Sequence, residues 1–172
     1  MNNMSQVWSE RNKVVNALLP VADAFAGTKN SDVVNLANYK KCTFLIFTGA
    51  TSTGTSVVTV NAGTSNSSAS TAIAFKYRTQ IAGTGGASGT TGSDIPSALT
   101  DATSTGFTTT ASKEGATYII EVDAATVAAA GTNYDHCKLT LTESKDSPVT
   151  GMVAAILSEP RYPQAVLQTA ID

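Results

Sequence analysis

The sequence predicts an all-β protein, an antiparallel β-sandwich or jelly-roll-like domain of about eight short strands. Two observations support this class. Short apolar or alternating runs recur along the chain and are separated by loops rich in Gly, Thr and Ser. Amphipathic helices do not alternate with these runs, which disfavours a parallel α/β fold. The pattern is densest over residues 39–78, which hold three strand-like runs.

The length of 172 residues fits one domain of ordinary size. We expect an N-terminal helical arm at residues 1–31, a β-sandwich at 32–158 with a long loop at 81–106, and an extended tail at 159–172. Only 14% of the residues are charged, against about 25% in typical soluble domains. The surface should therefore be largely neutral and rich in hydroxyl groups.

The arm is expected to contain a helix over residues 5–19, ended by Pro20. Its apolar residues recur at helical spacings of three, four and seven and include the only Trp: Val7, Trp8, Val14, Val15, Leu18 and Leu19. This apolar stripe needs cover. Either it packs on its own domain, or it clasps a neighbouring subunit.

The run from Phe44 to Phe47 is apolar at four successive positions, so we expect both of its faces to be covered at the centre of a two-layer core. The run at residues 71–78 alternates, with Ile73, Phe75 and Tyr77 on one face, and predicts a half-buried strand.

Other strands are expected at residues 33–36, 57–60, 107–111, 118–123, 136–143 and 151–158, the last of them central. Asp123 is placed to begin a short helix at residues 124–130, which Gly131 would end. Residues 49–54 and 62–70 are expected to be loops. Residues 81–106 have the weakest pattern and predict a projecting loop or a contact with a neighbour.

Few residues suggest chemistry. His136 is the only histidine and is expected on the solvent-facing side of its strand, which excludes a His-rich metal site. Glu121 and Asp123 lie two apart on one strand face and would form an acid/base pair or bind a hard cation only with a further group from elsewhere. A solvated face is the simpler interpretation.

The glycine-rich loop does not match a known functional motif. Ser88 lies one position short of the spacing of a nucleophile elbow, and Gly83, Gly85 and Gly89 lack the spacing and the lysine of a phosphate-binding loop. Asn66 begins a glycosylation-type triplet within a Ser-rich loop. We expect no enzymatic activity, no cofactor and no metal.

The charge pattern argues against nucleic acid as a partner. The formal net charge is −2, and Lys40–Lys41 is the only basic doublet. No apolar run approaches the roughly 20 residues that span a bilayer, so no membrane contact is expected. Cys42 and Cys137 are in phase with core positions of their strands, which favours two buried thiols over a mutual disulfide, although the disulfide remains open.

Five segments in the same order suggest a family: YKKCTFLIFTGATSTGTSVVTVNA, IAFKYR, GFTTTA, YIIEVDA and AILSEPRY. Together they resemble the small proteins that decorate or cement the heads of tailed bacteriophages, over nearly the whole chain from about residue 19. The predicted helical arm and the loop at residues 81–106 depart from the most compact members.

The resemblance implies a β-sandwich or jelly-roll subunit, a homotrimer, that binds the major capsid protein on the outer surface of the virion and stabilises the shell. Such a protein is made in the host cytoplasm and is not an enzyme. Two alternatives remain: another virion component, such as a tail, neck or fibre protein, or a carbohydrate-binding or adhesive β-sandwich.

Overall fold

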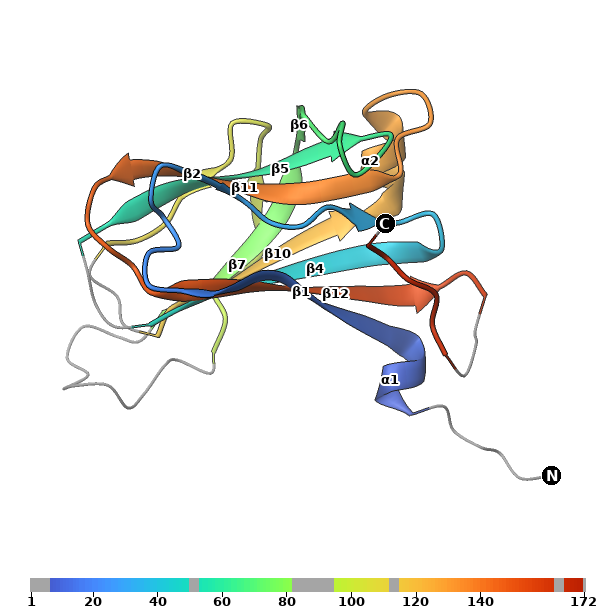
Figure 1. Cartoon of the computed structure of the whole chain (residues 1–172), viewed down its shortest axis with the longest axis horizontal. Helices are drawn as coiled ribbons and strands as arrows, with labels where there is room; N and C mark the ends of the chain where they lie inside the picture. Colours follow the sequence, from blue (N-terminus) through green and yellow to red (C-terminus); the bar gives the residue numbers. More distant parts are fainter. Residues whose placement is uncertain (1–6, 50–52, 82–94, 112–114, 163–165, 172) are drawn as a thin grey trace.

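The computed structural model is an all-β sandwich of two antiparallel sheets, with six strands in each. It describes residues 7–49, 53–81, 95–111, 115–162 and 166–171. In Figure 1 the two sheets form an upper and a lower layer, which confirms the predicted class. More strands form than the eight expected, because several short segments pair at the edges.

Sheet A is the lower layer of Figure 1. Its strands, in spatial order, are β1 (Asn12–Val21), β12 (Gly151–Pro160), β4 (Tyr39–Thr48), β10 (Thr117–Asp123), β7 (Phe75–Gln80) and β8 (Thr100–Ala102). The long strands β4 and β12 pair in register from end to end and lie in the interior of the sheet. The central positions expected for both are confirmed.

Sheet B is the upper layer, with the order β2 (Thr28–Asn30), β11 (His136–Lys145), β5 (Thr55–Gly63) and β6 (Thr71–Ile73). Two short strands complete it: β3 (Val34–Asn35) pairs with β11, and β9 (Phe107–Thr108) pairs with β5. Two short helices, α1 (Trp8–Arg11) and α2 (Ala124–Ala129), stand outside the sheets.

The core lies between the sheets because alternate residues of each strand point to the same face. In β4 these are Phe44 and Ile46, and in β11 they are Leu139 and Leu141; all four side chains are fully buried. Burial of apolar surface on this scale is the main term that favours the folded state.

The run at residues 71–78 changes sheets instead of forming one strand. Its first part, β6, pairs with β5 of sheet B, and its second part, β7, pairs with β10 of sheet A. Tyr77 in β7 then stacks on Phe107 in β9, with ring centroids 3.9 Å apart and planes 2° from parallel. This aromatic pair joins the two layers where the chain crosses between them.

The predicted helix at residues 5–19 is wrong except for its first turn. Only Trp8–Arg11 is helical, and the chain then enters β1, which pairs with β12 in register from Asn12 to Asn16 and with two register shifts after that. Pro20 does not end a helix. It lies in the edge strand of sheet A, where the missing N–H of a proline is tolerated.

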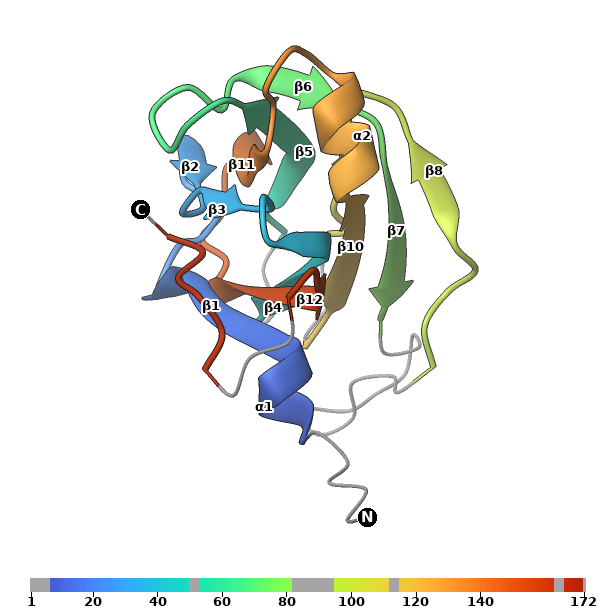
Figure 2. The ribbon, with the colours of Figure 1, turned by 90° about the vertical axis from the view of Figure 1, so that its right-hand side faces the viewer.

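Helix α2 follows Asp123 as expected and stands at one end of the sandwich (Figure 2), although the Asp123 side chain makes no capping hydrogen bond. Within the predicted loop at residues 81–106, β8 forms a strand and pairs with β7, whereas residues 82–94 lie outside the described residues. In the tail, Leu167 and Ala170 are buried, and the Tyr39 hydroxyl donates to the Gln168 carbonyl at 3.0 Å.

Truncating the β4 side chain that lies deepest in the core tests this packing. We expect Phe44→Ala to lower the free energy of unfolding by about 3–5 kcal/mol, because it removes a fully buried ring from between two sheets. The matched change at the preceding residue, Thr43→Ala, should lower the free energy of unfolding by less than about 1 kcal/mol, since Thr43 lies on the opposite, half-buried face. Denaturant unfolding measures both; equal losses would contradict the packing.

Candidate interaction surface

The outer face of sheet A, which points away from sheet B, carries an apolar patch over four neighbouring strands. Leu45 of β4 pairs with Ala154 of β12 on one side and with Ile119 of β10 on the other. Residues two positions apart along a strand share a face, so this patch also includes neighbours above and below that row. We define it as Val14, Leu45, Phe47, Ile119, Met152, Ala154 and Ile156.

The patch is only partly covered by its own chain. Phe47 is 37% exposed and Val14 is 50% exposed, while Leu45, Ile119, Met152 and Ile156 are intermediate. The expectation that both faces of the Phe44–Phe47 run are covered is therefore wrong for the outer face. A contiguous apolar surface of this kind is typical of an interaction site.

Charged side chains border the patch at the α2 end of the sheet. Lys41 forms an ion pair with Glu159, with 3.1 Å between Nζ and Oε1, and this carboxylate raises the pKa of Lys41 by hydrogen bonding and by its charge. Lys76 is paired with Asp101 across β7 and β8. Glu121 and Asp123 are exposed on the same face, as predicted, and are cross-strand neighbours of Lys76 and Lys41.

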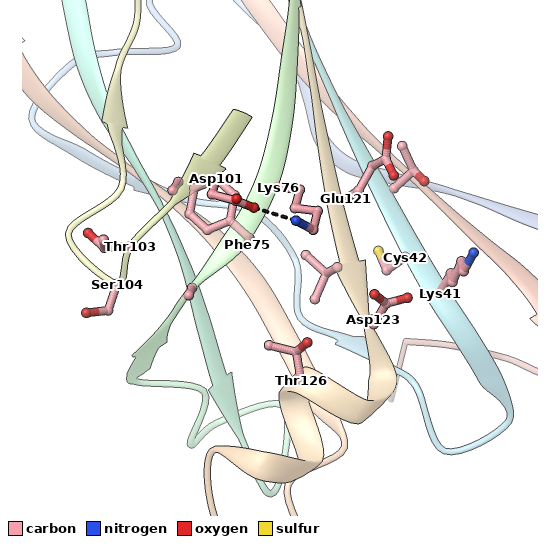
Figure 3. Close-up of a pocket in the computed structure, with 14 residues that line it drawn as sticks. Lys41, Cys42, Phe75, Lys76, Asp101, Thr103, Ser104, Glu121, Asp123 and Thr126 are labelled. Carbon is pink, nitrogen blue, oxygen red and sulfur yellow. Dashed lines mark hydrogen bonds and ion pairs between the residues drawn. The ribbon is translucent and has the colours of Figure 1, made fainter. Parts of the chain in front are cut away.

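A pocket of about 720 Å³ opens beside this charged border (Figure 3). It forms because β10 pairs with β7 only as far as Glu121 and Lys76. Beyond that point β10 runs into α2, while β7 connects back to sheet B. Its lining includes Phe75, Asp123 and Thr126, besides the Lys76–Asp101 pair, which Figure 3 shows across the opening.

The pocket offers charges and hydroxyl groups, and its two lysines are already engaged by carboxylates of the chain. Within the described ranges, His, Cys, Asp and Glu side chains do not gather in any group of three that could hold a metal ion. Among the described residues, Glu121 and Asp123 therefore have no third His, Cys, Asp or Glu side chain beside them that could complete a metal site.

His136 does not face solvent, and that prediction is wrong. It is 7% exposed, and its Nδ1 lies 2.5 Å from Oδ1 of Asp135. Its strand lies inside sheet B, where His136 pairs with Asn35 of β3 on one side and with Gly63 of β5 on the other. His136 is thus part of the packed structure, remote from the outer face of sheet A.

The cysteines are two buried free thiols, as predicted, one in each sheet. Burial raises the pKa of Cys42 well above its ordinary value, and the neighbouring thiol of Cys137 adds to the effect. Because the thiolate is the reactive form, Cys42 should be inert in the folded protein, and burial shields Cys137 from reagents.

Several residues singled out in the sequence give no site. Gly83, Gly85, Ser88 and Gly89 lie outside the described residues. Asn66 lies in a turn in which the neighbouring Ser and Thr hydroxyls bond to one another, Ser65 Oγ to Ser68 Oγ at 3.0 Å among them.

The apolar patch extends over several strands, so the pattern of the Phe44–Phe47 run alone does not predict it. The alternate positions that oppose the core set are apolar in three strands: Leu45 and Phe47 in β4, Ile119 in β10, and Met152 and Ile156 in β12. Three strands with apolar residues on both faces predict a sheet whose second face also needs cover.

Comparison with known proteins gives no assignment: no family model, no curated protein and no solved structure matches the chain. Across the part of the chain that the structure describes, the helices are too short to cross a bilayer.

The state of the two thiols can be measured directly. In the folded protein we expect a thiol-specific reagent such as Ellman's to react slowly at mildly alkaline pH, because both thiols are buried and the pKa of Cys42 is raised. After unfolding in guanidinium chloride, both thiols should react with the reagent immediately. Rapid reaction of both without denaturant would contradict the inter-sheet placement.

Proposed function

We propose that this protein is a non-enzymatic structural protein of a phage virion that binds the outer surface of the capsid and stabilises the head shell. Its partners are the major capsid protein and further copies of the chain. The single observation that carries the proposal is the apolar patch on the outer face of sheet A, taken together with the resemblance to head-decoration proteins.

The patch fits such a role because of its shape and its surroundings. It lies on a broad sheet built from regularly paired strands, with Leu45 and Ile119 near its middle. Binding to a rigid surface loses little conformational freedom, so more of the contact energy contributes to affinity. Charged pairs such as Lys41–Glu159 at the border can fix the orientation of a partner.

The mechanism follows from mass action. A protein that binds the assembled shell but not the free capsid subunits shifts the assembly equilibrium toward the shell. Copies that bridge several capsid subunits add their modest contact energies through multivalency. With a formal net charge of −2, neighbouring copies repel one another only weakly.

Capsid binding tests the proposal. Purified protein is incubated with expanded phage capsids that lack it, and the particles are sedimented and imaged by electron microscopy. We expect regular density on the outer shell. Phe47→Glu should weaken binding by about tenfold or more, because it places a charge in the apolar contact while the fold retains its core.

The matched control is Ile171→Glu, which makes the same kind of change at a similar exposure of 42%, in the tail. It should bind as the unmodified protein does. Absence of density under saturating conditions would overturn the proposal, and binding to isolated tails or fibres alone would place the protein elsewhere in the virion.

A further inference from the structure

One short segment, formed by Val7, α1 and β1, carries several exposed large apolar side chains. Four of them fall between residues 7 and 19: Val7 at 59%, Trp8 at 57%, Val14 at 50% and Leu19 at 64%. Of these, only Val14 belongs to the apolar patch of sheet A. Val7 and Trp8 lie at the start of α1, and Leu19 lies in β1, the edge strand of sheet A, which among the described strands pairs with β12 alone.

The backbone of this edge is unpaired over its first half, and the tail contacts it through the Lys13 side chain, whose Nζ donates to the Leu167 carbonyl at 3.5 Å. Within the described residues, the backbone of residues 13–16 makes no hydrogen bond on the side away from β12. The second half is blocked by Pro20, by two register shifts, and by the Asp32 N–H, which donates to the Ala17 carbonyl at 2.6 Å. A regular, unpaired strand edge is a template for a further strand.

The other edge strands of the described sheets are shorter and offer less backbone for a further strand to pair with. β8, β2 and β6 are each three residues long, and β8 carries Asp101. Short edge strands and charges are the features by which proteins prevent pairing between sheets. The edge of β1 at residues 12–16 is therefore distinct in length and regularity.

The sequence of this edge is self-complementary. Residues 12–16 read Asn, Lys, Val, Val, Asn, and the outer-face side chains Asn12, Val14 and Asn16 have the same order in both directions. In an antiparallel pair with its two-fold axis at Val14, Asn12 faces the partner's Asn16, Val14 faces its own copy, and Lys13 faces Val15. No like charges are opposed, which a strand pair requires.

The same two-fold axis would also cover the other exposed apolar side chains of this segment, Val7, Trp8 and Leu19. Trp8 precedes Val14 by six residues, and Leu19 follows it by five, so in the antiparallel pair α1 of one copy lies beside the Leu19 end of the other. In an isologous dimer the two-fold axis repeats this contact, so it occurs once on each side of the axis. Val7, Trp8 and Leu19 would then be covered by one another.

From these observations we propose that the β1 edge at residues 12–16 is an isologous docking site for a second copy of this chain, which joins two A sheets across a two-fold axis. The inference does not depend on the proposed capsid function. The homotrimer implied by the resemblance would require a different surface.

Charge substitution at the axis tests the inference. Sedimentation equilibrium over a range of concentrations should show dimers of the unmodified protein. Val14→Lys opposes two lysines at the axis and should weaken dimerisation by about 100-fold or more, as should Val14→Glu. An equal mixture of the two variants should restore dimers. Leu99→Lys, an apolar residue 41% exposed next to β8 at the other edge of the sheet, is the matched control.

A cross-link provides a second readout that does not rely on weakened binding. Side chains directly opposite in an antiparallel pair are close enough for a disulfide. Val14→Cys should therefore give a covalent dimer when treated with oxidised glutathione, which accepts the two electrons and two protons released as the two thiols join. Leu99→Cys should not. The native cysteines are buried and do not compete.

Three results would overturn the inference: a monomer at every concentration, dimers that Val14→Lys leaves unchanged, or a trimer unaffected by it. Failure here and failure of the capsid proposal are distinguishable, because Phe47→Glu should weaken capsid binding and leave the dimer intact. Circular dichroism confirms that each variant is folded, which is expected since Val14 is half exposed.

Discussion

The hydrogen-bonded ladder that β4 forms with β12 on one side and β10 on the other is the constraint on which the rest of the structure depends. It pairs residues far apart in sequence, such as Phe44 with Ala155 and with Ile120, in unbroken register. Because the side-chain period is two, this register decides which residues form the core. A slip of one residue would place Phe44 and Ile46 in solvent.

The same ladder fixes the outer face. Once Phe44 and Ile46 point inward, Leu45 and Phe47 must point outward, and pairing brings Ile119 and Met152 beside them. The apolar patch is thus a consequence of register and not of a separate binding motif. Because each strand is apolar on both faces, we infer that the second face is covered by another protein, and this inference underlies the proposed role in a virion.

The sequence predicted the fold class, the central strands and helix α2, because alternation and an Ala-rich run before Gly131 are local signals. It failed at β1. The doublets Val14–Val15 and Leu18–Leu19 supply the three and four spacings of a helix, but pairing with β12 puts them in a strand. The burial of His136 was also unpredictable, since it depends on cover from β3 and β5.

Side-chain footprinting of the assembled particle tests the central claim most directly. Hydroxyl-radical oxidation of the free protein and of the protein bound to capsids would be compared at Met152 and Phe47, with Ile171 in the tail as the internal reference. The account predicts that oxidation of Met152 and Phe47 falls strongly on binding while that of Ile171 changes little. Bound protein in which Met152 and Phe47 react as they do in the free protein would contradict it.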